Sequence, residues 1–284
     1  MSLALTSRSI PSRLFRNFTS LSPVASRTLI ARQKSWHLNL SLQTCCSSTP
    51  PANPLQKHAR PPAQFPPVPE QDHWYTGTPN NDADQIEKWL REDGHRVWGF
   101  VIYRSTYQSN ADWDEFMRRL LADITESLGD ADLLDNLALT VFDDPKKFDG
   151  ATTAVVRDHF KQWAATAEQE EQGPEFDPEQ IKIPGSQRYR YCIQITQEML
   201  ESVLADGNEK MPVVRIIRGD WKEYSPYEDG FRFEDEGEAI EGCTLEDVGW
   251  INVPFEDVML VTWCYLRDYW YIEYRRPPAI SCYP

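Results

Sequence analysis

The side chains best suited to chemistry in this chain are one histidine and one cysteine. His159 lies beside Phe160 on a predicted helix, where it is a candidate general base oriented by Asp158 or by an acid from elsewhere in the fold. Cys243 lies between a glycine and a threonine in a polar loop, which makes it the candidate reactive thiol. The alternatives are a surface or half-buried structural histidine and an ordinary thiol.

A run of acidic residues in the C-terminal third is a candidate cation site. Its carboxylates belong to Glu234, Asp235, Glu236, Glu238 and Glu241. Carboxylate oxygens bind Ca²⁺ or Mg²⁺, although this spacing does not match an EF-hand loop. The alternative is a solvated acidic loop, whose charge would attract a basic partner.

Standard cofactor and nucleophile motifs are absent from the sequence. It contains no G-x-x-x-x-G-K-[ST], G-x-G-x-x-G, G-x-S-x-G or H-E-x-x-H pattern. The six cysteines include no C-x-x-C pair, so neither a zinc site nor a disulfide framework is indicated. We therefore expect no cofactor.

Aromatic residues crowd the C-terminal third of the chain. They are Trp221, Tyr224, Tyr227, Phe231, Phe233, Trp250, Trp263, Tyr265, Tyr269, Trp270, Tyr271 and Tyr274. Such side chains line ligand pockets, and they also fill cores and dimer interfaces. The density favours core and interface over a pocket.

Apolar periodicity predicts the elements that must position these side chains. Periods near 3.6 predict helices at residues 82–93, 113–128, 152–171 and 196–205. Runs rich in β-branched and aromatic residues predict strands at residues 97–104, 137–142, 189–195, 212–218 and 249–253. Residues 255–268 fit either a helix or a buried strand, and residues 269–276 fit a last strand. Asn110 or Asp112 is expected to cap the second helix.

The order of these elements gives two β-α-β units with an extra helix between them. This order predicts a single α+β domain over residues 81–284. Its expected architecture is a ferredoxin-like α/β sandwich, with helices on one face of the sheet, the extra helix and C-terminal additions.

A basic, acid-free segment precedes this domain. The first 69 residues contain no Asp or Glu and carry a charge of +8. In a helical projection, the apolar side chains between Leu3 and Leu21 lie opposite three arginines, as in a mitochondrial transit peptide. We therefore expect a leader at residues 1–46 and mitochondrial import. A disordered tail or a wrongly spliced exon is the alternative, and it would leave the protein in the cytoplasm.

Residues 47–80 are predicted to form a linker. Nine prolines between Pro50 and Pro79 exclude a helix or a central strand there. Such a segment behaves as a semi-rigid polyproline II spacer.

The charge of the remaining chain limits its partners. Residues 70–284 carry a net charge of −23, which opposes binding to nucleic acid and to anionic membrane surfaces. The longest nearly apolar run, residues 258–266, is about half of the ~20 residues that a membrane-spanning helix needs.

Two stretches of the sequence resemble a known group of proteins. W-G-F-V-I-Y-R at residues 98–104, followed by W-D-E-F-M at 113–117, resembles the opening of a large group of uncharacterised fungal proteins. E-G-C-T-L-E-D-V-G-W at residues 241–250 resembles a later signature of the same group. The resemblance covers roughly residues 90–270. It implies a fungal source, no established activity and no catalytic residues to carry over.

The sequence therefore favours a soluble, non-enzymatic interaction domain that meets a protein partner or a second copy through its acidic loop and aromatic surface. One alternative is an enzyme on a ferredoxin-like scaffold that acts on a small apolar molecule, with His159 or a tyrosine as proton carrier. Another is a domain that binds a divalent cation through residues 234–241.

Overall fold

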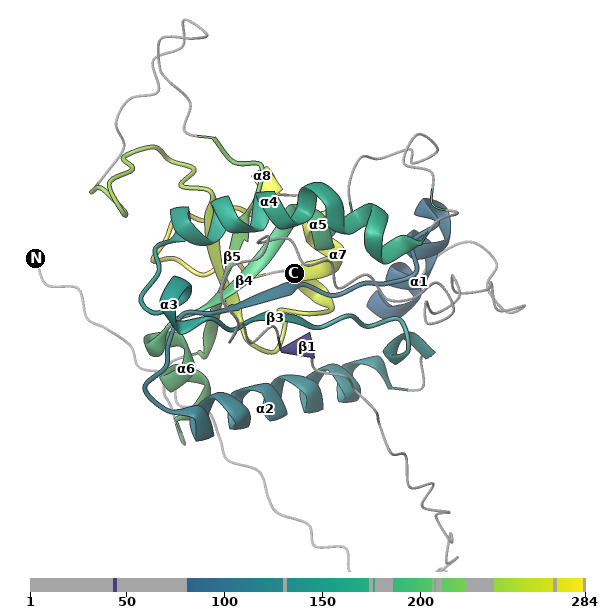
Figure 1. The fold of residues 1–284 in the computed structure, drawn as a ribbon, viewed down its shortest axis with the longest axis horizontal. Helices are drawn as coiled ribbons and strands as arrows, with labels where there is room; N and C mark the ends of the chain where they lie inside the picture. The colour runs from purple at the N-terminus through teal and green to yellow at the C-terminus, as the bar shows by residue number, and fades with distance from the viewer. Residues whose placement is uncertain are drawn as a thin grey trace, which may run out of the picture. The chain divides into compact units, whose positions relative to one another are not determined.

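A mixed β-sheet with helices on both faces forms the body of the protein (Figure 1). The computed structural model describes residues 43–44, 81–129, 132–173, 176, 186–205, 207, 211–222, 238–267 and 270–282. The strands are β1 (Gln43–Thr44), β2 (Val101–Arg104), β3 (Thr140–Phe142), β4 (Tyr191–Ile195), β5 (Val213–Arg218) and β6 (Trp250–Pro254). The helices are α1 (Asp82–Asp93), α2 (Asn110–Leu128), the 3-10 turn η2 (Asp132–Leu134), α3 (Pro145–Phe148), α4 (Thr153–Gln172), α5 (Gln187–Arg190), α6 (Gln197–Leu204), α7 (Val261–Leu266) and α8 (Trp270–Glu273).

The order of the strands in the sheet is β1-β3-β2-β4-β5-β6. The pairs β1–β3, β3–β2 and β2–β4 are parallel, whereas β5 runs antiparallel to both β4 and β6. The two-residue strand β1 comes from the segment expected to be a leader, and it extends a sheet of five longer strands. The helices and this mixed sheet confirm the predicted α+β class.

Alternation along the central strands divides the core into two clusters. On β2, Ile102 joins the cluster that contains α1, α2, α6 and α7. Val101 and Tyr103 point to the opposite face, where Val156 and Phe160 of α4 cover them. Figure 1 shows α2 and α4 on opposite sides of the sheet.

The expected coverage of a single face is therefore corrected, and a ferredoxin-like topology is not confirmed. From β2 the chain moves to β3 on one side, and from β3 it returns past β2 to β4 on the other. Crossovers between parallel strands are right-handed almost without exception, so two that run in opposite directions place their helices on opposite faces of the sheet. The order of the strands in the sheet therefore decides which face each helix covers. The order of the elements along the chain does not determine that strand order.

Local capping explains where the main helices begin and end. The side chain of Asn81 accepts a hydrogen bond from Asp84 N at the start of α1, and Gly94 ends this helix with a φ of 66°. Thr152 caps α4, and its side chain accepts a hydrogen bond from Val155 N. At α2 the cap is Ser109 rather than Asn110 or Asp112, the two positions expected from the sequence.

The C-terminal region differs most from its expected structure. Residues 269–276 were predicted to form a strand, but α8 occupies Trp270–Glu273 instead. The ambiguous run at residues 255–268 contains the short helix α7. Among the described residues, no helix has the length and apolar character needed to cross a bilayer.

An acidic cluster beside α2 makes the stability of the protein depend on pH. Burial, followed by the neighbouring Glu256, raises the pKa of Asp123 from 3.8 to about 6. Since folding disfavours the ionised form, the cost to stability is absent below about pH 4 and complete above about pH 6.

We expect Asp123→Asn to raise the melting temperature at neutral pH, with the gain disappearing as the pH falls to about 4. Thermal melts followed by circular dichroism across this range measure the effect. Asp114→Asn, at an exposed position of the same helix, is the matched control. Equal gains for Asp123→Asn at both ends of the pH range would contradict the assignment.

Candidate functional site

His159 is held in an aromatic cluster on the α4 side of the sheet. Its Nδ1 lies 2.9 Å from the hydroxyl of the fully buried Tyr103, within hydrogen-bond distance. The rings of Phe142 and Phe148 pack edge-on against it, with centroids 4.8 and 5.1 Å away. Asp158, the acid considered as its orienting group, is exposed on the same helix.

Electrostatics favours a neutral His159. Burial lowers the pKa of His159, the nearby Lys147 lowers it further, and Asp144 acts in the opposite direction. Burial also raises the pKa of Tyr103 well above its ordinary value. The pair therefore fixes the orientation of the imidazole, and the aromatic rings around it are packed against one another. This geometry matches the structural alternative that the sequence left open.

Cys243 lies in a turn rather than in an open polar loop. Its backbone exchanges two hydrogen bonds of 2.9 Å with Ile240, and its half-buried side chain packs against the core cluster of the α4 face. This packing gives the thiol a structural role in the turn.

Of the five predicted cation ligands, Glu238 and Glu241 lie within the described residues, whereas residues 234–236 lie outside them. The carboxylate of Glu241 accepts hydrogen bonds from Thr153 N at 3.1 Å and from the Thr153 hydroxyl. Its other oxygen lies 3.2 Å from Arg215 Nη1. In the part of the chain that the structure describes, no three His, Cys, Asp or Glu side chains come together as a metal site.

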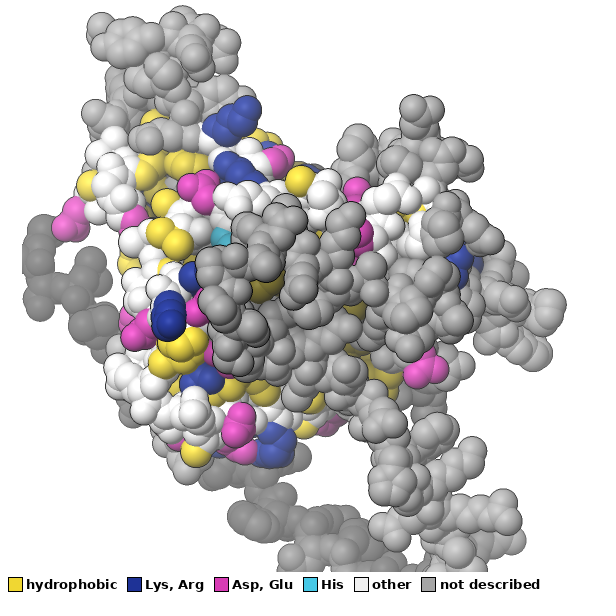
Figure 2. Space-filling model, in the orientation of Figure 1, with side chains coloured by type: hydrophobic (Ala, Val, Ile, Leu, Met, Phe, Trp, Pro, Cys, Tyr) yellow, Lys and Arg dark blue, Asp and Glu magenta, His cyan; other side chains and the backbone are white. Residues whose placement is uncertain are grey.

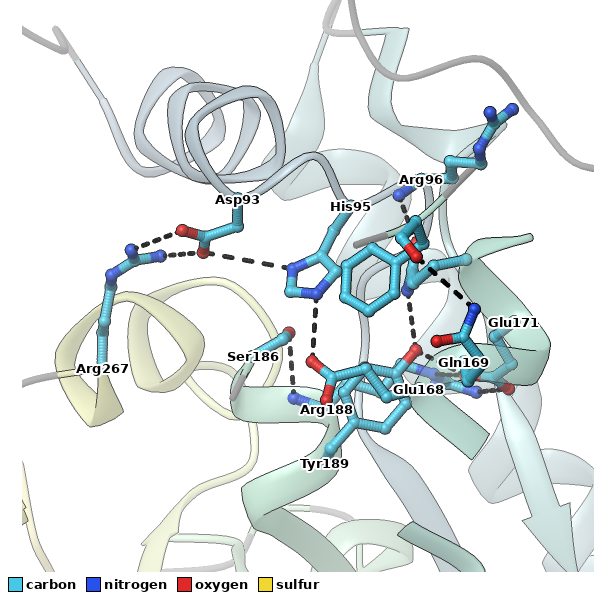
Figure 3. A network of polar contacts seen from close by, with 12 residues as sticks. Asp93, His95, Arg96, Glu168, Gln169, Glu171, Ser186, Arg188, Tyr189 and Arg267 are labelled. Atoms are coloured by element: carbon cyan, nitrogen blue, oxygen red, sulfur yellow. Dashed lines mark hydrogen bonds and ion pairs between the residues drawn. The ribbon is translucent and has the colours of Figure 1, made fainter. Parts of the chain in front are cut away.

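A buried polar network that the sequence does not reveal connects α4 with the sheet (Figure 3). The fully buried Arg188 donates to the carbonyl oxygens of Gly99 and Ala138 at 2.8 and 2.6 Å, and to Thr140 Oγ1 at 2.7 Å. It also makes a two-pronged ion pair with Glu171, at 2.6 and 2.7 Å. The guanidinium therefore links the C-terminal end of α4 to β3 and to the residues just before β2.

The network continues through a second buried ion pair. Arg267 contacts Asp93 through two bonds of 2.7 and 3.0 Å. The buried His95 lies 4.0 Å from Asp93 and 3.1 Å from Glu168 of α4. Figure 3 shows His95 between these two carboxylates. The ends of α1, α4 and α7 are thus connected through side chains.

Residues 168–172 at the end of α4 are all polar, as in a solvated helix end, yet Glu171 faces a buried cation and Gln172 is fully buried. Gln172 Nε2 donates to the Tyr189 hydroxyl at 2.7 Å, and that hydroxyl donates to Glu171 at 2.9 Å. The polar groups of this network satisfy one another, so its chemistry is structural.

The short helix α8 exposes two large hydrophobic side chains. Tyr271 is 75% exposed and its neighbour Ile272 is 62% exposed, whereas Trp270 beside them is buried. Trp270 stacks on Tyr191, with ring centroids 5.6 Å apart and planes at 19°. Arg218, at the end of β5, donates to the Tyr271 hydroxyl at 2.8 Å.

These contacts hold the exposed Tyr271 side chain in a defined position. The Arg218 guanidinium lies over the Tyr271 ring, 5.2 Å from its centroid, and pairs with Asp220 at 2.6 Å. An exposed aromatic and an exposed aliphatic side chain supported by arginine have the composition of an interface centre. We call Tyr271, Ile272 and Arg218 the α8 surface.

In comparisons with known proteins, no family model matches this chain, and neither a curated protein nor a solved structure gives a match. Function is therefore inferred from the contacts of the chain itself.

Removal of the Arg188 side chain tests the structural role of the buried network. We expect Arg188→Met to lower the free energy of unfolding by about 3 kcal/mol, because Glu171 loses its cation and two backbone carbonyls lose a donor. Urea unfolding measures the change.

Arg118→Met is the matched control, because Arg118 makes an ion pair with Glu115 on the exposed side of α2. We expect no measurable change for it. A similar loss in both variants would show that the buried network contributes no more than a surface pair.

Proposed function

We propose that this protein is an interaction domain that docks a basic protein partner on the α8 surface. The observation that carries the proposal is the adjacent exposure of Tyr271 and Ile272 on a short helix anchored by a buried tryptophan. Other exposed large hydrophobic side chains of the described residues, Val155 and Met211, are 47% exposed and far from α8 in the sequence.

The energetics of this surface favour docking. Removal of a large apolar side chain from water contributes about 1.5–3 kcal/mol, so Tyr271 and Ile272 together can supply the centre of a small interface. The contact with Arg218 restricts the Tyr271 ring before any partner arrives. A side chain that is already ordered loses less entropy on binding.

Charge decides which partner is favoured. A net charge of −23 on residues 70–284 repels a second copy of the chain as well as nucleic acid, and it attracts a basic protein. On the face seen in Figure 2, the acidic side chains of the described residues are scattered among basic and hydrophobic ones. Long-range attraction therefore comes from the net charge, and the apolar pair supplies the local contact.

The two alternatives from the sequence have weaker support. For an enzyme, the His159 environment offers packed aromatic rings around a neutral imidazole. For a cation site, both carboxylate oxygens of Glu241 already have protein partners.

Site-specific photo-crosslinking tests the docking proposal. With benzoylphenylalanine at position 272, we expect covalent adducts with a basic protein in a lysate of the source cells. Tyr271→Ala in the same chain should reduce the adduct, and high salt should reduce it further because it screens the charge attraction.

The matched control carries the photoreactive residue at position 211, where the native side chain is also exposed. Identical adducts at 272 and 211 would contradict a specific surface. An adduct with a second copy of the chain would replace the basic partner with a homodimer.

We further propose that residues 1–46 direct the protein to mitochondria, on the basis of their acid-free, arginine-rich composition. Labelled full-length chain should become protease-protected in isolated, energised mitochondria and should be shortened at its N-terminus. Replacement of Arg8, Arg13 and Arg16 by Gln should reduce the protected fraction. Unchanged import of that variant, or no import of the native chain, would reject the proposal.

A further inference from the structure

Residues 238–248, here called the strap, are held in part by side chains from the segment that follows α8. Arg276 donates to the carbonyl oxygens of Glu238 and Leu245 at 2.9 and 3.1 Å, and to that of Cys243 at 3.4 Å. A single guanidinium therefore fixes three points along the strap.

Tyr274 holds the other end of the strap. Its hydroxyl donates to the carbonyl of Glu246 at 2.7 Å and accepts from Val248 N at 3.0 Å. Trp270 of α8 adds a hydrogen bond from its indole Nε1 to the side chain of Asp247 at 3.0 Å. The helix that presents the α8 surface is thus continuous with the clamp on the strap.

Within the strap, the backbone has few bonds of its own. Among the described residues, the one pair of backbone hydrogen bonds inside it joins Ile240 and Cys243. Both side chains pack on the core cluster of the α4 face. Such a segment, clamped by side chains and lying outside the strands, has the features of a unit that opens locally.

Glu241 fastens the strap to the rest of the protein. Its carboxylate bonds Thr153 in the first turn of α4 and pairs with Arg215 of β5. Its φ of 48° lies in the left-handed region, which is unfavourable for a residue with a side chain. The carboxylate contacts therefore maintain a backbone conformation that Glu241 would otherwise leave.

We propose that the strap is a movable cover, clamped by Arg276 and Tyr274 and latched by Glu241. Release of either the clamp or the latch lifts residues 238–246 of the strap from the α4 face and exposes Cys243, while Val248 and the rest of the core stay folded. The α8 segment carries both the docking surface and the clamp, so docking is the event that would control the strap. This trigger rests on the proposed function, whereas the clamp and the latch do not.

Pulsed labelling with N-ethylmaleimide tests the strap, because the chain contains its own reporters. Cys243 is half-buried in the strap, whereas Cys192 and Cys264 are buried in the core. Peptide mass spectrometry of the labelled full-length chain gives a separate rate for each thiol. Selective labelling of Cys243 reports strap opening, and labelling of all three reports global unfolding.

We expect Arg276→Met and Glu241→Ala each to label Cys243 about tenfold faster than the native chain, since each loses hydrogen bonds that involve a charged group. Tyr274→Phe is the conservative variant, because it keeps the ring and loses only the hydroxyl bonds. It should accelerate Cys243 labelling by a smaller factor. Labelling of Cys192 and Cys264 should stay at the native rate in all three variants.

Arg118→Met, far from the strap in sequence and exposed, should leave every rate unchanged. The proposal is overturned by an unchanged Cys243 rate in the clamp and latch variants, or by parallel acceleration at Cys192 and Cys264. These rates are measured on the chain alone. A failed crosslinking experiment would therefore reject the docking function without affecting the result for the strap.

Discussion

The buried guanidinium of Arg188 is the contact on which the rest of this fold depends. It supplies donors to the backbone where β2 and β3 begin, and its charge is neutralised by Glu171 from α4. A buried arginine is tolerated only when its donors and its charge are all satisfied. The position of α4 over the sheet is therefore tied to the pairing of β2 with β3. Gly99 belongs to the same constraint: its φ is 100°, and a side chain there would collide with Leu137.

The same use of arginine recurs elsewhere in the interior. Arg157 donates to the carbonyls of Arg218, Val248 and Gly249, and Arg104 contacts Asp143, Asn110 and the carbonyl of Thr106. These cations act on backbone and carboxylate groups inside the protein. A chain that is already acidic thus commits several of its positive charges to internal structure. Most of them are neutralised by a carboxylate, as Arg188 is by Glu171 and Arg104 by Asp143. The net negative charge of the body is therefore left to the remaining side chains, which suits the proposed basic partner.

Local rules predicted much of the fold. Periodicity gave α1 over residues 82–93, and it gave the stripe of α2 from Trp113 to Leu128. Such features depend on residues three or four positions apart. Strand order and the face covered by α4 depend on crossovers between distant segments, so they were beyond this reasoning. The buried network was missed for the same reason, since Arg188 and its partner carbonyl at Gly99 are separated by 89 positions.

The wrong prediction for residues 269–276 has a specific cause. The aromatic residues in that stretch favour a strand by propensity, but the bridge next to β6 at Asn252 is made by Ile280 instead. The aromatic residues instead divide their roles in a short helix and the turn after it. Trp270 enters the core, Tyr271 points outward, and Tyr274 bonds the strap. Three aromatic residues within a stretch of five therefore contribute to the core, to the exposed surface and to the clamp. This division of roles places the exposed pair beside the segment whose position it would control.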